Sequence, residues 1–250
     1  MSPAWTEQEI ALARRIHRTL LPLEDHDDKR VQWAVRCLEH DRLGGDYCTV
    51  RYVGDDRLFL CICDVTGHGL SAALMAGRIN SFVRHETEHA QHPCEVVQHL
   101  NAFLTEKFSG LGVFATFFCA LLDFRVGQIL YAGAGHPPAL LSSQDGGDSV
   151  VLVSESPMLG VMDAERFPCG VCCEPLRSGD RLLLYTDGLI EARDADGNFF
   201  GQAALESAFV GWKPNVSTGS FADALIGQIT DFSGAESFDD DILLVALTIK

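Results

Sequence analysis

The sequence has no long apolar run and little positive charge, and each of these absences excludes a class of function. No stretch approaches the ~20 apolar residues of a membrane-spanning helix, and the start, residues 1–9, lacks the basic and apolar segments of a signal peptide. Lysine and arginine number 19 against 35 acidic residues, a formal charge of −16. Nucleic acids and anionic membranes both attract basic surfaces. We therefore predict a cytoplasmic protein with no nucleic-acid or membrane partner.

The nine cysteines do not form a recognisable disulfide or metal framework. Most lie within apolar segments, which is typical of buried thiols in a reducing compartment. Cys169 and Cys172 form a C-x-x-C spacing, but a structural zinc site needs a second pair of ligands and none with that spacing follows. We interpret the segment as a cysteine-rich strand, with zinc or redox chemistry as the alternative.

The chain shows no internal repeat and no low-complexity tract, and its length suits one large domain or two small ones. Residues 5–21 carry an apolar helical face, begin with a possible capping box at Thr6 and Glu9, and are followed by Pro22. The charged stretch at residues 24–30 is typical of a linker. We therefore divide the chain into a linker or regulatory helix, residues 1–23, and a globular domain, residues 24–250.

The order of the remaining elements predicts an α+β protein. Strands are expected over residues 31–38, 47–53, 58–64, 113–123, 128–132, 139–141, 150–153, 167–174, 181–186 and 242–249, helices over residues 71–87, 93–108, 203–210 and 221–232, and a loop tip at residues 144–148. The continuous apolar run at residues 58–64 suits a strand that is buried on both faces. Runs of strands separated by helix pairs predict an antiparallel sandwich that is covered by helices.

Four acidic segments each adjoin a glycine turn or the end of an apolar strand. They contain Asp46 (G-G-D), Asp64 (D-V-T-G-H-G), Asp187 (Y-T-D-G) and the run at residues 239–241 (D-D-D). A single aspartate beside glycine is usually a turn residue, but four in this setting are much harder to explain that way. Hard divalent cations prefer oxygen ligands. The pattern indicates a divalent-metal hydrolase site at strand ends.

The motifs resemble the catalytic domain of the PPM metal-dependent serine/threonine phosphatases, in the bacterial RsbU and SpoIIE-like branch. The resemblance covers about residues 10–250 and rests on these segments: G-G-D-Y at 44–47, D-V-T-G-H-G-L-S-A-A at 64–73, A-T-F at 115–117, Y-A-G-A-G-H-P-P-A at 131–139, M-L-G at 158–160, G-D-R-L-L-L-Y-T-D-G-L-I-E-A at 179–192 and D-D-I at 240–242. The helix that ends R-R-I-H-R-T-L-L-P at residues 14–22 resembles the helix that joins regulatory domains to this phosphatase.

The resemblance implies a four-layer α/β/β/α sandwich with two Mn²⁺ or Mg²⁺ ions at one sheet edge. It makes Asp64 the bridging ligand, adds the Val65 carbonyl, places Asp187 and Asp240 on the other sheet, and lets Asp46 bind directly or through a water. Within the acidic run we choose Asp240, because the family's acidic pair directly precedes a branched apolar residue.

Two histidines are candidates for catalysis. His68 lies beside the bridging ligand and can act as the acid that protonates the leaving serine alkoxide, because histidine titrates near neutrality; the alternative is a structural turn histidine. His136 is more readily interpreted as holding a turn than as touching substrate. The sequence departs from the family at Thr49, where another aspartate is common, and this puts an outer-shell or third-metal contact in doubt.

The resemblance predicts a protein-serine phosphatase that acts on a phosphorylated anti-sigma-factor antagonist or a similar signalling protein. A catalytically weak sensor or scaffold module and a hydrolase of small phosphoesters are the alternatives; loss of Asp64 or Asp187 would have favoured the scaffold, and both are present. We also predict that residues 14–21 mediate dimerisation or contact a regulatory domain or protein, the alternative being a helix that packs on its own domain.

Overall fold

The computed structural model describes residues 6–40, 43–142, 149–234 and 238–250. The loop expected at residues 144–148 lies outside these residues. The strands are β1 His26–Asp27, β2 Val31–Leu38, β3 Tyr47–Val53, β4 Arg57–Val65, β5 Ala115–Asp123, β6 Gln128–Ala134, β7 Ala139–Ser142, β8 Val150–Leu152, β9 Cys172–Pro175, β10 Arg181–Tyr185 and β11 Ile242–Ile249. The helices are α1 Glu7–Arg18, α2 Leu70–Glu86, α3 Pro93–Lys107, α4 Asp187–Ile190, α5 Gly201–Val210 and α6 Thr218–Ser233, with a 3₁₀ turn at Ala164–Arg166.

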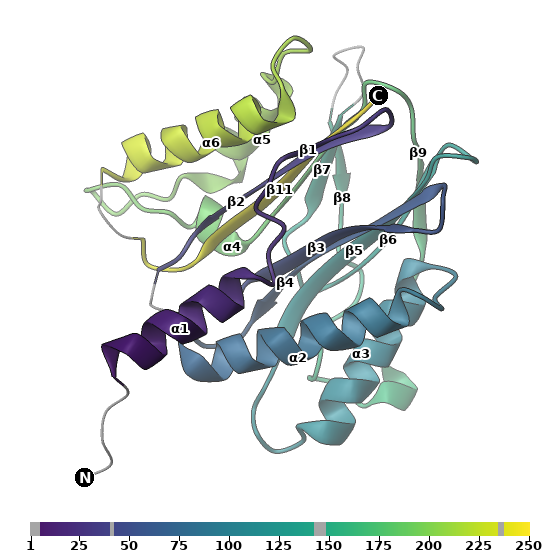
Figure 1. The fold of residues 1–250 in the computed structure, drawn as a ribbon, viewed down its shortest axis with the longest axis vertical. Coiled ribbons are helices and arrows are strands. Elements are labelled where there is room, and N and C mark those ends of the chain that lie inside the picture. Colours follow the sequence, from purple (N-terminus) through teal and green to yellow (C-terminus); the bar gives the residue numbers. More distant parts are fainter. Residues whose placement is uncertain (1–5, 41–42, 143–148, 235–237) are drawn as a thin grey trace.

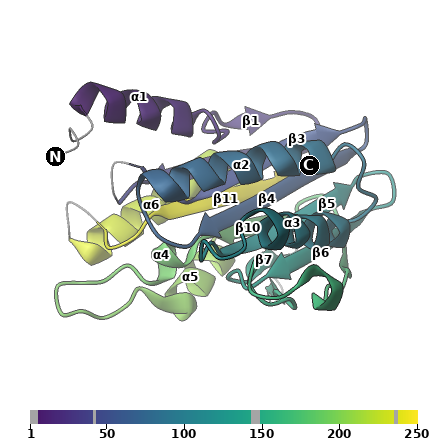
Figure 2. The same ribbon diagram turned by 90° about the horizontal axis from the view of Figure 1, so that it is seen from below.

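Two antiparallel sheets face each other and helices cover their outer faces (Figure 1). One sheet has the order β1-β2-β11-β10-β7-β8 and the other β3-β4-β5-β6-β9. Helices α5 and α6 cover the first sheet, and α2 and α3 cover the second; Figure 2, seen from below, shows α1 alongside α2. The predicted α+β sandwich with helical outer layers is confirmed.

The last strand, β11, shows why polar and apolar residues alternate so little along the central strands. Leu243, Val245 and Leu247 of β11 join the core between the sheets, whereas Leu244 and Ala246 pack toward α5 and α6. Successive side chains of a strand point to opposite faces, so a strand with apolar layers on both sides must be apolar at every position. The continuous apolar run of β4 has the same explanation, because residues 58–63 are all buried.

Helix α4 was not predicted, and two further segments differ from the sequence-based expectation. Residues 24–30, predicted as a linker, contain β1, which pairs with β2 and stacks the His26 ring on Trp33 with centroids 3.6 Å apart. The strand predicted over residues 167–174 begins only at Cys172. Pro168, which lacks a backbone N–H and cannot donate to a sheet ladder, lies in the part of this segment that forms no strand.

Helix α1 begins with the capping box that the sequence predicts: the Thr6 hydroxyl accepts from the backbone of Glu9, whose carboxylate accepts from the backbone of Thr6. The helix contacts the sandwich, since His17 is buried and Arg14 donates a hydrogen bond to Glu39. Its role as a linker stays a prediction. Within the described parts of the chain, no helix has the length and hydropathy to cross a membrane.

Candidate metal centre

The four acidic segments meet where strands of both sheets end. Asp64 is the penultimate residue of β4, and Asp46 directly precedes β3, whose Tyr47 is paired with Cys63. Asp187 follows β10, and Asp240 lies just before β11. Because β3 and β4 belong to one sheet and β10 and β11 to the other, the aspartates come from both sides of the sandwich.

Glycines let the acidic segments approach one another closely. A Cβ atom at Gly45 would lie 2.7 Å from the carbonyl oxygen of Val65, and one at Gly188 would lie 2.1 Å from the carbonyl oxygen of Asp241. Neither side chain could be accommodated without moving backbone. The glycines of G-G-D and Y-T-D-G are therefore required by tertiary contact between the motifs.

The aspartates raise one another's pKa. Burial and then the charge of Asp64 raise the pKa of Asp46 well above its usual range. Burial and then the charges of Asp187 and Asp240 raise the pKa of Asp64 to about 7. Burial and the charge of Asp240 also raise the pKa of Asp187. This mutual repulsion shows that the carboxylates lie close enough to affect one another's charge. A bound cation would relieve the repulsion.

The donor set fits a hard cation. The Oδ2 atom of Asp46 is buried and has no hydrogen-bond partner, which is costly for a carboxylate oxygen unless a cation or water satisfies it. The Thr186 hydroxyl also hydrogen-bonds to Asp46. Within the residues that the structure describes, no three His, Cys, Asp or Glu side chains already stand in the close arrangement of a formed metal cluster. The acidic segments therefore supply oxygen ligands, which a bound cation would draw closer together.

The three aspartates of the acidic run have different surroundings. Asp239 is exposed and forms an ion pair with Arg193 at 3.7 Å. Asp241 is buried and accepts a hydrogen bond from the backbone of His40 at 2.8 Å, which ties the run to the end of β2. Asp240 is exposed, and its charge acts on both Asp64 and Asp187. These surroundings favour Asp240 as the ligand, while Asp241 holds the segment in place.

His68 and Thr49 are placed differently from the aspartates. His68 is exposed on the turn between β4 and α2, four residues after Asp64, and its catalytic role stays a prediction. Thr49 is buried in β3 and its hydroxyl lies 3.4 Å from the Asn80 side chain of α2. The position at which the family commonly has aspartate is thus a buried contact between a strand and a helix.

His136 is buried rather than open to substrate. Its Nδ1 atom lies 2.8 Å from the Thr116 hydroxyl and its Nε2 atom 3.1 Å from the carbonyl oxygen of Tyr185. Burial lowers the pKa of His136 to about 3. These contacts agree with the interpretation that His136 holds a turn and disfavour direct contact with substrate.

Sequence reasoning missed Thr186 and Thr116. Thr186 accepts a hydrogen bond from the backbone of Leu243 at 3.0 Å, so it joins β10 to β11 as well as contacting Asp46. Both threonines lie inside motifs that the sequence analysis quoted, Y-T-D-G and A-T-F, and that position in the motifs was the available signal.

The C-x-x-C pair has the character of ordinary thiols. Burial and contact with Cys94 raise the pKa of Cys169 to about 12, and burial raises the pKa of Cys172. Metal binding and redox attack require the thiolate, so these shifts favour the interpretation as a cysteine-rich segment.

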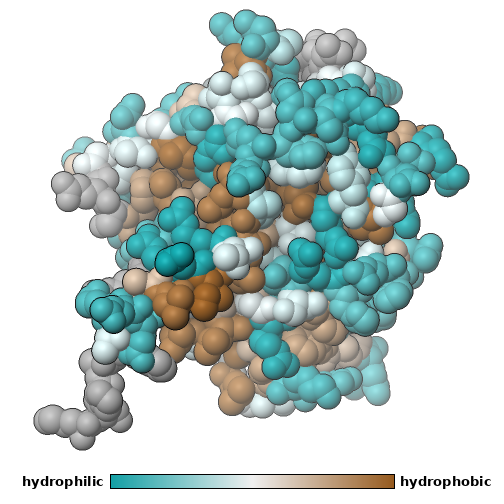
Figure 3. All heavy atoms as spheres, viewed as in Figure 1, coloured by the Kyte–Doolittle hydropathy of each residue, from teal (hydrophilic) through white to brown (hydrophobic). Residues whose placement is uncertain are grey.

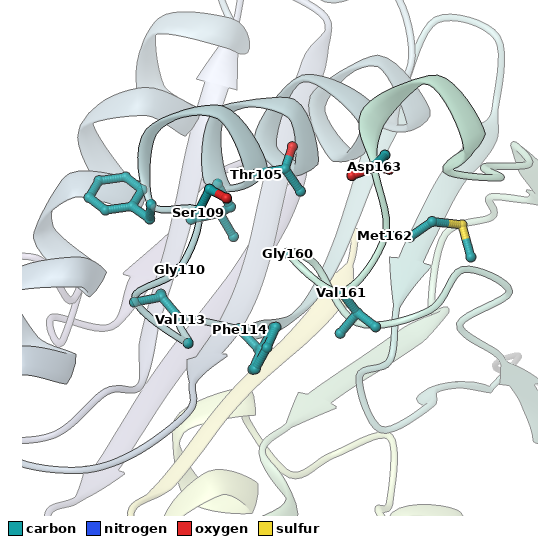
Figure 4. A pocket seen from close by; sticks show the side chains of 12 residues that line it. Thr105, Ser109, Gly110, Val113, Phe114, Gly160, Val161, Met162 and Asp163 are labelled. Carbon is teal, nitrogen blue, oxygen red and sulfur yellow. The ribbon is translucent and has the colours of Figure 1, made fainter.

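A pocket of about 420 Å³ lies near the D-V-T-G-H-G turn (Figure 4). It lies between the end of α3, the segment up to Phe114, and residues 160–163. Phe114 joins the pocket to the D-V-T-G-H-G turn, because its carbonyl oxygen accepts hydrogen bonds from the backbone and the hydroxyl of Thr66, both at 3.0 Å. Figure 4 shows the Val161 and Phe114 side chains at the lower edge of the group of residues that line the pocket.

The arrangement of the two sheets and their helices is the fold of the PP2C-type phosphatase domain. The structure matches the SiaA-PP2C domain of Pseudomonas aeruginosa with a TM-score of 0.84 over 97% of this chain and 96% of that one, at 21% identity. It also matches the RsbU and RsbW domains of a Mycobacterium tuberculosis protein, with a TM-score of 0.72 and 26% identity over 92% of this chain and 63% of that one.

The sequence identifies the family. The model of the Stage II sporulation protein E (SpoIIE) family matches residues 54–250, and the chain belongs to this family. It is 27% identical to phosphoserine phosphatase RsbU of Bacillus subtilis, over 76% of this chain and 56% of that protein. It is 28% identical to protein IcfG of Synechocystis sp., over 96% of this chain. The chain spans 41% of IcfG and 46% of the RsbP phosphatase of Bacillus subtilis, less than half of either relative.

Proposed function

We propose that the chain hydrolyses phosphoserine on a protein with the help of two divalent cations, Mn²⁺ or Mg²⁺. The observation that carries the proposal is that Asp46 has a buried Oδ2 atom without a hydrogen-bond partner, while the pKa of Asp64 in the same site is raised. Asp64 would contact both ions, Asp187 and Asp240 would hold them from the other sheet, and Asp46 and the Val65 carbonyl would complete the set. When bound, such ions activate a water and neutralise phosphate charge.

The residues of the chain would supply position and a proton. Asp46, Asp64 and Asp187 would be ionised in the metal-loaded protein, since a cation favours the charged form of each carboxyl. His68, exposed on the turn after Asp64, would donate a proton to the serine oxygen as it leaves. The Asp64 and Asp187 side chains are only half-buried, which supports a substrate presented on a protein surface.

The substrate we propose is a phosphorylated anti-sigma-factor antagonist or a similar signalling protein. RsbU and RsbP are named as phosphoserine phosphatases, and one structural neighbour combines an RsbU domain with an RsbW domain. The net charge of −16 supports a protein partner over a nucleic acid.

The test is phosphate release from a phosphoserine protein and from p-nitrophenyl phosphate, with and without Mn²⁺. We expect Mn²⁺-dependent turnover by the wild type and none by Asp187→Asn. A folded protein that binds Mn²⁺ and turns over neither substrate would contradict the proposal. It would favour the scaffold alternative, which the sequence leaves open.

We further propose that the outer face of α1 contacts a regulatory domain or a second copy of the chain. Leu12 and Ile16 of α1 are 57% and 60% exposed, and Leu74 of the neighbouring α2 is 64% exposed. Figure 3 shows apolar side chains gathered at the surface where these two helices lie. Replacing Leu12 and Ile16 by glutamate should abolish self-association or the response to a regulator while the metal site is kept. An unchanged oligomeric state and regulation would contradict the proposal.

A further inference from the structure

His136 lies where the chain crosses from one sheet to the other. It follows β6 of the five-stranded sheet and precedes β7 of the six-stranded sheet. Its side chain is only 5% exposed. The Ser154 hydroxyl donates a hydrogen bond to its backbone carbonyl at 2.8 Å, so the backbone of the crossover is held as well as the ring.

The two hydrogen bonds of the ring fix its tautomer. The carbonyl oxygen of Tyr185 can only accept, so the Nε2 atom of His136, 3.1 Å away, must carry the proton. The Nδ1 atom is then an acceptor for the Thr116 hydroxyl at 2.8 Å. A buried histidine with both ring nitrogens hydrogen-bonded in this way is neutral, and its ring is held in one orientation. The pKa of His136, which burial lowers, agrees with the neutral form.

Each partner of the ring lies next to a candidate metal ligand. Thr116 on β5 is paired directly across the strands with Asp64 on β4. Tyr185 ends β10, two residues before Asp187. Thr116 and Tyr185 belong to different sheets. One imidazole therefore spans the gap between β5, which is paired with the strand of Asp64, and β10, which ends two residues before Asp187.

The hydrogen bonds of His136 can fix the distance between the two sheet edges more closely than apolar packing can. Side chains in the core between the sheets hold them together, but these contacts are non-directional. A metal-binding constellation must be held within about 0.5 Å of its productive geometry. Hydrogen bonds have a preferred length and angle, so the bridge can set the separation of the two sheet edges.

We infer that His136 is a positioning residue which sets the separation of Asp64 and Asp187, and so the affinity of the site for divalent cations. The inference rests on the proposed metal-dependent function. It gives the histidine of A-G-H-P-P a role in metal binding without contact with metal or substrate, and it makes Thr116 the second member of the same bridge.

The test measures Mn²⁺ binding by titration calorimetry, which does not depend on turnover. We expect His136→Ala to weaken Mn²⁺ binding by roughly 10-fold or more, the range found when residues that support metal ligands are removed. Activity should be largely recovered at saturating Mn²⁺. His136→Gln retains an N–H donor for the Tyr185 carbonyl and should bind Mn²⁺ more tightly than the alanine variant. Thr116→Val, nearly the same shape, serves if His136→Ala does not fold.

The matched control is Thr218→Val, which removes another buried threonine hydroxyl, bonded to Thr248 at 2.9 Å on the face covered by α6. It should lower the melting temperature and leave Mn²⁺ affinity unchanged. Wild-type Mn²⁺ affinity in both His136→Ala and Thr116→Val would overturn the inference alone, whereas a wild type that binds no Mn²⁺ would contradict the proposed function itself. ¹⁵N spectra of the ring should show the Nε2–H tautomer from pH 5 to pH 9, and the other tautomer would also overturn the inference.

Discussion

Asp28 and Asp46 are both aspartates, yet the fold gives their carboxylates opposite surroundings. Asp28, in the turn between β1 and β2, accepts hydrogen bonds from the Tyr52 hydroxyl at 2.6 Å and from the backbone of Arg30 and Val31 at 2.8 and 3.0 Å. Asp46, at the acidic edge, has a buried Oδ2 atom with no partner.

The pKa shifts of the two acids follow from these surroundings. Burial would raise the pKa of Asp28, but the hydrogen bonds outweigh it and hold that pKa well below its usual range. Burial raises the pKa of Asp46, and the charge of Asp64 adds to the effect. The comparison teaches that a carboxylate whose oxygen atoms are supplied with donors stabilises the fold, whereas one with a buried oxygen atom left unpaired among like charges is suited to a cation.

The largest effect is expected at the acidic edge. Asp187→Asn should lower kcat/KM by at least about 10³-fold, roughly 4 kcal/mol of transition-state stabilisation, because a neutral amide is a poor ligand for a divalent cation. Phosphate release at saturating Mn²⁺ measures it. Activity within 10-fold of the wild type would remove Asp187 from the ligand set.

Gly188→Ala tests whether close packing of the motifs matters as much as their charges. The new Cβ would lie 2.1 Å from the carbonyl oxygen of Asp241, so the acidic run must move. A displacement near 1 Å costs on the order of 10²-fold in rate, and we expect a loss of that size. The control is Gly227→Ala in α6, where a Cβ meets no atom within 4 Å; it should stabilise the protein by up to about 1 kcal/mol and leave activity unchanged.

Asp28→Asn tests the structural side of the comparison. The variant loses charge-assisted hydrogen bonds, so the free energy of unfolding should fall by about 2 kcal/mol, while activity per folded molecule stays at the wild-type level. The exposed pair of Asp223 with Arg36 is the control, and Asp223→Asn should cost less than about 1 kcal/mol. Urea unfolding measures both, and equal losses would contradict the distinction.

The pH dependence of the Asp28 contribution has a definite sign. The folded-state pKa lies below the ordinary value of 3.8, so the stabilisation is present above about pH 4 and is lost as the pH falls below it. The difference in unfolding free energy between the wild type and Asp28→Asn should therefore shrink on acidification.

Asp64→Asn should change stability by less than Asp28→Asn does, and in the opposite direction. In the metal-free protein the folded-state pKa of Asp64 is about 7, above its ordinary value of 3.8. The ionised carboxylate therefore destabilises the fold above pH 7, and protonation relieves this as the pH falls toward 4. We expect the variant to be more stable than the wild type by roughly 1 kcal/mol at pH 8 in the presence of a chelator, about 2–4 °C in Tm.

The gain in Asp64→Asn should disappear near pH 4, where the wild-type carboxyl is also neutral. Mn²⁺ binding by the wild type should weaken as the pH falls through about 7, since a proton competes for the same oxygen atoms. A variant that is less stable than the wild type at pH 8 would contradict the proposed repulsion and place Asp64 with Asp28 among the structural acids.

Local patterns made much of this fold predictable. The strands at Val31–Leu38, Tyr47–Val53 and Ile242–Ile249 have the predicted bounds, because apolar runs flanked by turn residues leave few alternatives. The short strand β1 was not predictable from its two residues, His26 and Asp27, since it forms only through pairing and stacking with β2.

The sequence by itself determined the family, the layered fold and the four acidic motifs, because strand hydropathy and glycine turns are local properties. Only the tertiary structure decided how the motifs meet: that Gly188 lies against Asp241, that the Oδ2 atom of Asp46 is left without a partner, and that Asp241 accepts a hydrogen bond from the backbone of His40 while Asp240 is exposed. It also showed His136 between the two sheets. These relations join residues far apart in the chain, and burial and distance, which set pKa and ligand geometry, exist only once the chain is folded.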